Sequence, residues 1–198
     1  MNILMNAGTT ALLVGGGIIL FCILISVLWW IKASNSFKKM NVKIEEATSG
    51  IDVALTKRFD LLTKMVQAVK GAMVHEKETL TQIVQMRLPK PNASISEKAI
   101  FSNKLGDGFD KLNVTLENYP NLKAASNVTE LQKGVIEVEE NLQAARRLYN
   151  SNVSYYNQKL ITFPNNVVAR KMGLSKAEFF EAEERKKQDV NIDFNWLF

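Results

Sequence analysis

The sequence predicts an all-α protein, in which an N-terminal single transmembrane helix is followed by an elongated antiparallel helical bundle. Three long helices and short C-terminal helices make up the expected bundle. Residues 11–31 are an uncharged apolar run, and most other apolar residues recur in steps of three and four. No segment alternates with the period of two that is typical of a strand. We expect an anchor at residues 1–35, the bundle at 36–185 and an aromatic tail at 186–198.

The apolar run Ala11–Ile31 is long enough to cross a membrane. It contains no charged residue, and about 20 apolar residues suffice to cross the hydrocarbon core. A cleavable signal peptide has a shorter apolar core and a basic segment before it, whereas no Lys or Arg precedes this run. We therefore expect an uncleaved anchor, with the lipid bilayer as a partner. The single cysteine, Cys22, lies in this run and excludes a disulfide framework within the chain.

The charges next to the anchor predict its orientation. The first charged residue is Lys32, and more lysines follow it closely. The positive-inside rule then places the short N-terminus outside and the C-terminal bundle in the cytoplasm. The lysines serve either as a plain stop-transfer flank or as a site for anionic lipid. The residues expected at the membrane interface are Trp29, Trp30, Lys32, Lys38 and Lys39.

Small residues form a ridge on one face of the anchor. Ala7, Ala11 and Gly15 recur at every fourth position, and such ridges allow transmembrane helices to approach closely. Because the same pattern is also common by chance, it is a hypothesis that this face mediates self-association. It predicts a homo-oligomer.

The first two helices of the bundle follow from apolar spacing and proline. The first is expected from about Ser36 to Leu88, and the prolines of Pro89–Ser94 end it because proline cannot continue a helix. Ser94 or Ser96 is expected to cap the second helix. The apolar stripe of the first helix is Ile44, Ile51, Leu55, Leu62, Met65, Val69 and Ile83, and that of the second is Ile95, Leu105, Phe109, Leu112 and Leu116.

The third helix has the most regular seam in the chain. From Val128 to Phe163, seam residues follow one another in steps of three and four, as in antiparallel bundles and coiled coils. The stretch "FPNN" ends this helix, and "VVARKMGL" and "KAEFFEAEERKK" predict one or two short helices after it. Short connections favour antiparallel neighbours.

Charged residues share the stripe of the expected first helix. These are Arg58, Glu76 and Arg87. A polar seam residue costs stability but specifies register and partner, so each would need a partner on another helix. The candidate partners on the third helix are Glu137, Glu139, Glu140 and Arg146. Alternatively, these long side chains lie at the edge of the stripe and reach water.

The sequence offers little for catalysis or metal binding. His75 is the only histidine, which excludes a zinc-protease helix and paired Glu-x-x-His ligands. There is no nucleotide fingerprint or phosphate-binding loop. The net charge of +5 is too diffuse for a nucleic-acid footprint. We expect no catalytic residues, no metal, no cofactor and no nucleic-acid partner.

The C-terminal stretch "DFNWLF" (Asp193–Phe198) carries three aromatic residues and a leucine. Exposed, it would be an unusual apolar patch. It either packs back onto the bundle or docks on another chain or on lipid.

Several blocks together resemble the LemA family. After the N-terminal membrane helix come "IDVALTKRFDLLTKMVQAVKGAMVHEKETL", "YPNLKA", "ELQKGVIEVEENLQAARRLYNSNVSYYNQKLITFPNNVVA" and "EFFEAEE", in this order. The resemblance implies a single-pass bacterial inner-membrane protein with a cytoplasmic helical bundle and no established enzymatic activity. The recurrent polar positions that it implies are Arg58, Asp60, His75, Glu76, Arg87, Arg146 and Asn150.

Three functions are compatible with these observations. The first is a membrane-anchored helical scaffold that self-associates and organises membrane or partner proteins, including other membrane proteins, without catalysis. The alternative is a membrane-tethered signalling or adaptor module that relays a partner or ligand state. Its outside segment of about ten residues is too short for a sensory pocket. The third is an enzyme with a site near Arg58, His75 and Glu76.

Overall fold

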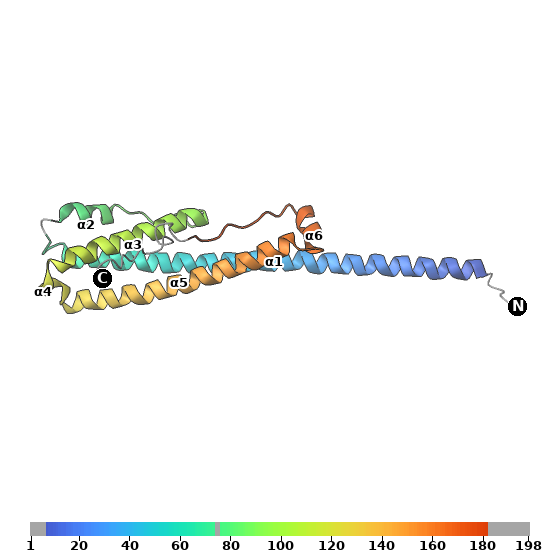
Figure 1. Cartoon of the computed structure of the whole chain (residues 1–198), viewed down its shortest axis with the longest axis horizontal. Helices are drawn as coiled ribbons and strands as arrows, with labels where there is room; N and C mark the ends of the chain where they lie inside the picture. Colours follow the sequence, from blue (N-terminus) through green and yellow to red (C-terminus); the bar gives the residue numbers. More distant parts are fainter. Residues whose placement is uncertain (1–6, 74–75, 182–198) are drawn as a thin grey trace, which may run out of the picture. The chain divides into compact units, whose positions relative to one another are not determined.

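All regular structure in the computed structural model is helical, across the residues that it describes, 7–73 and 76–181 (Figure 1). The all-α fold class predicted from the sequence is confirmed. The helices are α1 (Ala7–Val69), α2 (Lys77–Val84), α3 (Ile95–Glu117), α4 (Pro120–Lys123), α5 (Ser126–Ile161) and α6 (Asn165–Lys171). The bounds of α3 and α5 agree closely with the expected second and third helices.

The chain divides into two compact units, and α1 and α5 contribute to both. Unit 1 contains the described residues up to 43 and residues 154–177. The Phe37 and Tyr156 rings meet edge to face in it, with centroids 6.1 Å apart. The Lys159 ammonium lies 5.8 Å from the Phe37 centroid and donates a hydrogen bond to Ser36 Oγ. The buried apolar residues of unit 1 include Ala33, Phe37, Met40, Tyr156, Val168 and Ala169.

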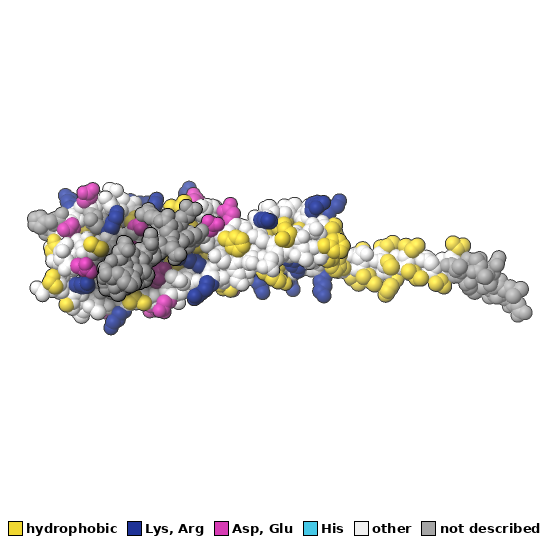
Figure 2. All heavy atoms as spheres, in the orientation of Figure 1, with side chains coloured by type: hydrophobic (Ala, Val, Ile, Leu, Met, Phe, Trp, Pro, Cys, Tyr) yellow, Lys and Arg dark blue, Asp and Glu magenta, His cyan; other side chains and the backbone are white. Residues whose placement is uncertain are grey.

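The N-terminal part of α1 carries a continuous set of exposed apolar side chains. From Leu12, 77% exposed, to Ile31, 50% exposed, the large aliphatic residues are open to their surroundings (Figure 2). An 18-residue window here has a mean hydropathy of 2.7, and none of it is buried. By length and composition, this helix can cross a membrane.

Unit 2 contains residues 44–153 and the short segment 178–181. The C-terminal half of α1 packs antiparallel to the N-terminal part of α5. Lys57 pairs with Glu137 at 3.0 Å. A Cβ on Gly50 would lie 4.0 Å from Ala145, and a Cβ on Gly134 would lie 3.3 Å from Leu61. The core is built from leucine, isoleucine, valine, methionine and phenylalanine of α1, α3 and α5. Its fully buried members include Ile51, Leu55, Leu62, Met65, Leu105, Leu112, Leu116 and Leu142.

Helix α3 runs parallel to α1, although short connections had favoured antiparallel neighbours. The contacts advance in the same direction along both helices. Asp52 pairs with Lys98, Arg58 donates to Ser102, and Leu62 lies 3.0 Å from where a Cβ on Gly108 would be. The parallel course is possible because residues 70–94 carry the chain back along α1 before α3 begins. Helix α2 lies within this returning segment.

The expected first helix, Ser36–Leu88, is therefore wrong at its C-terminal end. Helix α1 stops at Val69, and Ala72 N and Met73 N both donate to Val69 O in the turn that follows. Gly71 lies in this turn, and glycine costs about 1 kcal/mol in a helix interior relative to alanine. Met73, 1% exposed, is buried by the turn. The end of α1 thus coincides with Gly71 and with the burial of Met73.

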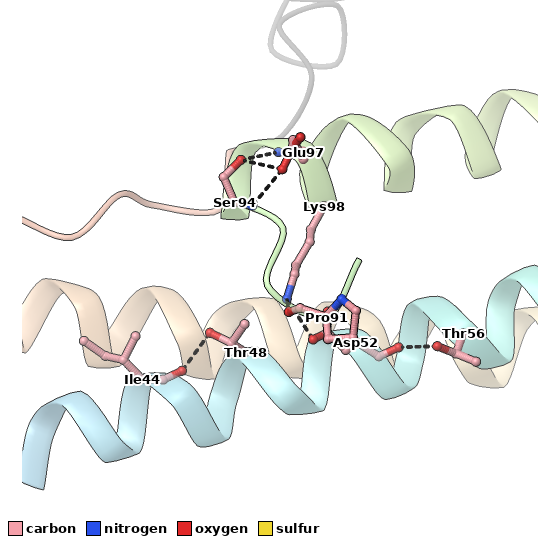
Figure 3. A network of polar contacts seen from close by, with 8 residues as sticks. All are labelled: Ile44, Thr48, Asp52, Thr56, Pro91, Ser94, Glu97 and Lys98. Carbon is pink, nitrogen blue, oxygen red and sulfur yellow. Dashed lines mark hydrogen bonds and ion pairs between the residues drawn. The ribbon is translucent and has the colours of Figure 1, made fainter. Parts of the chain in front are cut away.

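Of the two serines predicted as possible caps, Ser94 and Ser96, Ser94 caps α3. Ser94 Oγ accepts from Glu97 N at 3.1 Å, and the Glu97 carboxylate accepts from Ser94 N at 2.9 Å. This reciprocal arrangement satisfies two backbone donors at the helix start. One residue later, Lys98 extends away from the cap to Asp52 of α1 and to Pro91 O (Figure 3). The side chain of Lys98 thus ties α3 and the returning segment to α1.

Candidate functional site

Four polar side chains from three helices meet inside unit 2. Arg58 of α1 lies 2.8 Å from the Glu139 carboxylate of α5. Its Nη1 donates to the carbonyl oxygen of Ser102 on α3 at 3.1 Å and lies 3.5 Å from Ser102 Oγ. Arg146, two turns along α5 from Glu139, donates from Nη2 to the same Ser102 Oγ. We call Arg58, Ser102, Glu139 and Arg146 the arginine cluster.

The arginine cluster places two guanidinium groups around one carboxylate in a largely buried setting. Arg58 is only 8% exposed and Ser102 1%. Burial lowers the pKa of Arg58, against the opposing attraction of Glu139 and Asp110. Burial also lowers the pKa of Arg146, which Glu139 opposes and the neighbouring positive charge of Arg58 reinforces. The cluster therefore depends on Glu139 to hold two positive charges together.

Some hydrogen-bonding capacity of the arginine cluster is unused among the described residues. The Nε atoms of Arg58 and Arg146 are buried and have no hydrogen-bond partner there. Glu139 Oε2 contacts the Arg58 guanidinium as an ion pair, but without the geometry of a hydrogen bond. The contact between Glu139 and Arg58 is therefore an electrostatic attraction at 2.8 Å and not a directional hydrogen bond.

Aromatic rings cover both guanidinium groups. Arg58 Cζ lies 5.6 Å from the centroid of Phe109, and Arg146 Cζ lies 4.8 Å from that of Phe180. Cation–π contacts at such distances contribute on the order of 1 kcal/mol. Phe180 is itself 5% exposed, so a residue beyond the helices completes the packing around Arg146.

Two side chains of α5 hold the segment that carries Phe180. Asn150 binds the Phe180 backbone on both sides, accepting from its N–H at 2.8 Å and donating to its carbonyl at 3.0 Å. The Tyr149 hydroxyl donates to Glu178 O at 2.9 Å. Burial, and to a lesser degree the charge of Glu178, raise the pKa of Tyr149. In unit 1, Asn157 binds Ala177 in the same two-sided way.

This arrangement corrects the expectation for "KAEFFEAEERKK". Residues 174–181 have no helical structure, while α6 accounts for the first of the expected short helices. An asparagine that satisfies both backbone groups of a residue replaces the hydrogen bonds that a helix would have supplied. Asn150 and Asn157 are seven residues apart and so lie on one face of α5.

A groove of about 680 Å³ opens beside the arginine cluster, between α3 and α5. Arg58 forms part of its wall. Its apolar part is made by Phe109, Val135 and Ile136, and the other lining residues are Asp110, Asn113, Glu139, Glu140, Gln143 and Arg147. Positive and negative charges are mixed, so the groove suits a peptide-like occupant with both apolar and polar groups better than a simple ion.

Other predicted residues lie elsewhere. Glu76 is the residue before α2, and Arg87 is exposed and donates to the carbonyls of Val84 and Met86. Neither shares a helix with Arg58, so the single stripe expected for all three is wrong, because α1 ends first. Of the four candidate partners for Arg58, the structure brings Glu139 to it.

The remaining predicted residues belong to unit 1 or lie outside the described part. Trp29 is half-buried, Trp30 is 37% exposed, and Lys32, Lys38 and Lys39 are exposed. A Cβ on Gly15 would meet nothing within 4 Å. The side chains of Ala7 and Ala11, all of His75 and the tail 186–198 lie outside the described residues.

The described side chains do not assemble a metal site. Within residues 7–73 and 76–181, no group of three His, Cys, Asp or Glu side chains is placed to hold a metal ion. Lys98 and the arginine cluster are engaged in contacts between helices. The chemistry that these charges perform within the described fold is the fixing of helices against one another.

The fold and its polar cluster define a class: all-α proteins with a membrane-length N-terminal helix and a helical unit joined by internal ion pairs. The sequence model of the LemA family matches residues 47–194, more than half of the chain. The chain therefore belongs to the LemA family, as the sequence blocks predicted.

Individual relatives agree with this assignment. Protein LemA of Metamycoplasma hominis is 28% identical over 178 residues, which cover 88% of this chain and 81% of that protein. Magnetosome proteins MamQ 1 and MamQ 2 of Paramagnetospirillum magneticum are each 28% identical over 93 residues, covering 47% of this chain and 34% of theirs. The likeness to the magnetosome proteins thus concerns only part of either chain.

Proposed function

We propose that this protein is a single-pass, membrane-anchored helical scaffold that self-associates in the bacterial inner membrane and organises membrane or partner proteins without catalysing a reaction. The observation that carries the proposal is the exposed apolar surface of α1 from Leu12 to Ile31. Monomeric soluble proteins rarely expose an apolar patch larger than a few hundred Å². A bilayer is the environment in which such a surface is stable.

The rest of the described chain supports a binding role over a chemical one. The buried charges, Lys98 and the arginine cluster, pair with groups of neighbouring helices. A catalytic group needs access to a substrate and a matched proton donor or acceptor. The described residues instead supply long helical surfaces with polar flanks, which suit contact with other proteins.

Gly15 supports self-association through the membrane helix. Space is open around a Cβ built on Gly15, Gly16 or Gly17, so a second helix could approach the backbone there. We expect Gly15→Leu to lower the mass of the full-length particle in nanodiscs, because a leucine on the ridge would separate the helices. Gly17→Leu is the matched control, since position 17 lies about 200° around the helix from position 15.

Mass measurement of these nanodisc particles distinguishes the alternatives. A loss of mass in Gly15→Leu but not in Gly17→Leu supports self-association through the ridge. A monomer in the parent protein contradicts the self-association proposal. A partner that co-purifies with fixed stoichiometry in place of a homo-oligomer would favour the adaptor function instead.

The orientation of the anchor is tested separately by cysteine labelling. In a Cys22→Ser background, an Asn2→Cys variant should react with a membrane-impermeant maleimide on intact cells. A Val42→Cys variant, at a position that is 61% exposed, should react only after lysis. The reason is the cluster of lysines that follows the span, which favours the cytoplasmic side. Labelling of Val42→Cys on intact cells would reverse the proposed topology.

A further inference from the structure

The groove between α3 and α5 lies directly ahead of the segment that α5 already binds. Asn150 and Arg146 hold Phe180, and the described chain ends one residue later at Glu181. Gln143 and Glu139, which line the groove, precede Arg146 in the sequence at steps of about one helical turn, on the same face of α5. The face that binds residues 178–180 thus continues as the lining of the groove.

We propose that residues 182–198 of the same chain dock in this groove and place the aromatic stretch Phe194–Phe198 against Val135 and Ile136. The groove is an intramolecular receptor for the C-terminal tail. This inference concerns the bundle alone and does not depend on the scaffold function or on self-association.

The tail is long enough to reach the groove. Arg146 and Ile136 are ten residues apart on α5, which corresponds to about 15 Å along the helix axis. The aromatic stretch begins fourteen residues after Phe180, and fourteen residues span at most about 46 Å. The whole groove is therefore within reach of the aromatic stretch without any change in residues 178–181.

The chemistry of the tail matches that of the groove. Ile136 is 63% exposed in the groove wall, and burying such a side chain against aromatic rings removes apolar surface from water, which is favourable. The tail offers the carboxylates of Asp189 and Asp193 and the positive charges of Arg185–Lys187. The groove lining offers the opposite charges, from Arg58 and Arg147 and from Asp110, Glu139 and Glu140. Arg58 also keeps a buried Nε–H without a partner among the described residues. An occupant with apolar groups and charges of both signs suits this mixed lining.

Disulfide crosslinking of the full chain tests the proposal directly. In a Cys22→Ser background, Ile136→Cys is paired with Asn195→Cys under mild oxidation. The matched control pairs Val53→Cys with Asn195→Cys, because Val53 is similarly exposed, at 67%, but does not line the groove. We expect the groove pair to form a disulfide within one chain much faster than the control pair. Non-reducing gels and peptide mass spectrometry give the rate and the pairing.

Each outcome of this experiment decides the proposal. Equal rates for both pairs would overturn it, since the tail would then have no preference for the groove. A disulfide that forms only between two chains would also overturn it, and would assign the groove to the tail of a second copy. A disulfide that forms fast within one chain for the Ile136 pair, but not for the Val53 pair, supports the proposal.

Tryptophan fluorescence provides a second readout that does not require a crosslink. After Trp29→Phe and Trp30→Phe, Trp196 is the only tryptophan in the chain. We expect its emission to be blue-shifted and protected from acrylamide. Ile136→Glu should abolish that protection, whereas Val53→Glu should leave it unchanged. Full quenching of Trp196 in the parent would contradict docking.

Discussion

Replacing Glu139 with glutamine is expected to destabilise unit 2 by about 3 kcal/mol, as when one partner of a buried ion pair is removed. Glutamine keeps the shape of the side chain but removes the only carboxylate of the arginine cluster. Arg58 and Arg146 would then repel each other across Ser102, with the more distant charge of Asp110 as partial compensation. The expected loss is at the low end of the range for buried ion pairs, because the Glu139 side chain is 32% exposed and water partly solvates it.

The matched variants for this prediction remove an arginine instead. Arg58→Met should change stability by less than about 1 kcal/mol. The Glu139 carboxylate would still face the positive charge of Arg146 and is 32% exposed, so it is not left as an uncompensated buried charge. The double variant Arg58→Met/Glu139→Gln should recover part of the loss caused by Glu139→Gln. Chemical unfolding of the full chain in nanodiscs measures the stability of all three variants. The mass of the nanodisc particles reports their assembly separately.

Two results would change this interpretation. A loss below about 1 kcal/mol for Glu139→Gln would mean that water screens the pair as it does exposed ion pairs. If Arg58→Met left both stability and assembly unchanged, the hypothesis that Arg58 specifies helix register would fail.

The second large effect is expected at the ion pair between α1 and α3. Asp52→Asn should destabilise unit 2 by about 3 kcal/mol because it leaves a buried ammonium group without its counter-charge. The Lys98 side chain is 2% exposed and lies 2.7 Å from Asp52, and its other partner is Pro91 O at 3.2 Å (Figure 3). A carbonyl dipole alone compensates a buried positive charge only in part.

The reverse substitution should cost less. Lys98→Met leaves Asp52 unpaired, but the Asp52 side chain is 37% exposed, so water can solvate its carboxylate. We expect a loss of about 1 kcal/mol, which is the usual net value of a hydrogen bond. Measuring the free energy of unfolding of Asp52→Asn and of Lys98→Met tests this order. A larger loss for Lys98→Met than for Asp52→Asn would show that the lysine stem, and not its charge, holds α3 in place.

Part of the candidate site could be predicted from the sequence. Arg58 was expected on a buried face because it shares helical spacing with Leu55, Leu62 and Met65. Glu139 and Arg146 were among the candidate partners on the third helix. Periodicity shows that a charged side chain faces a neighbouring helix, so it narrows the partners to one face of that helix. It does not give the axial register that selects Glu139 from Glu137 or Glu140.

Other parts of the site were not predictable by the same means. Ser102 joins the two arginines only because α3 runs parallel to α1, and no local signal specifies that direction. Lys98 is almost fully buried although lysine is nearly always exposed unless it is paired. Phe180 reaches Arg146 from a non-helical segment in a region where the pattern predicted a helix.

The sequence by itself determined the helical class, the membrane-length apolar run, the approximate bounds of α3 and α5, and a serine cap for α3 at Ser94 or Ser96. These features depend on interactions within about one helical turn, which composition and spacing record. Only the tertiary structure decided that α1 ends at Val69, that α3 runs parallel to α1, and that residues 174–181 are not helical. These outcomes depend on contacts between groups that are distant in sequence, such as the Asn150–Phe180 hydrogen bonds, and helical spacing along the chain does not record such contacts.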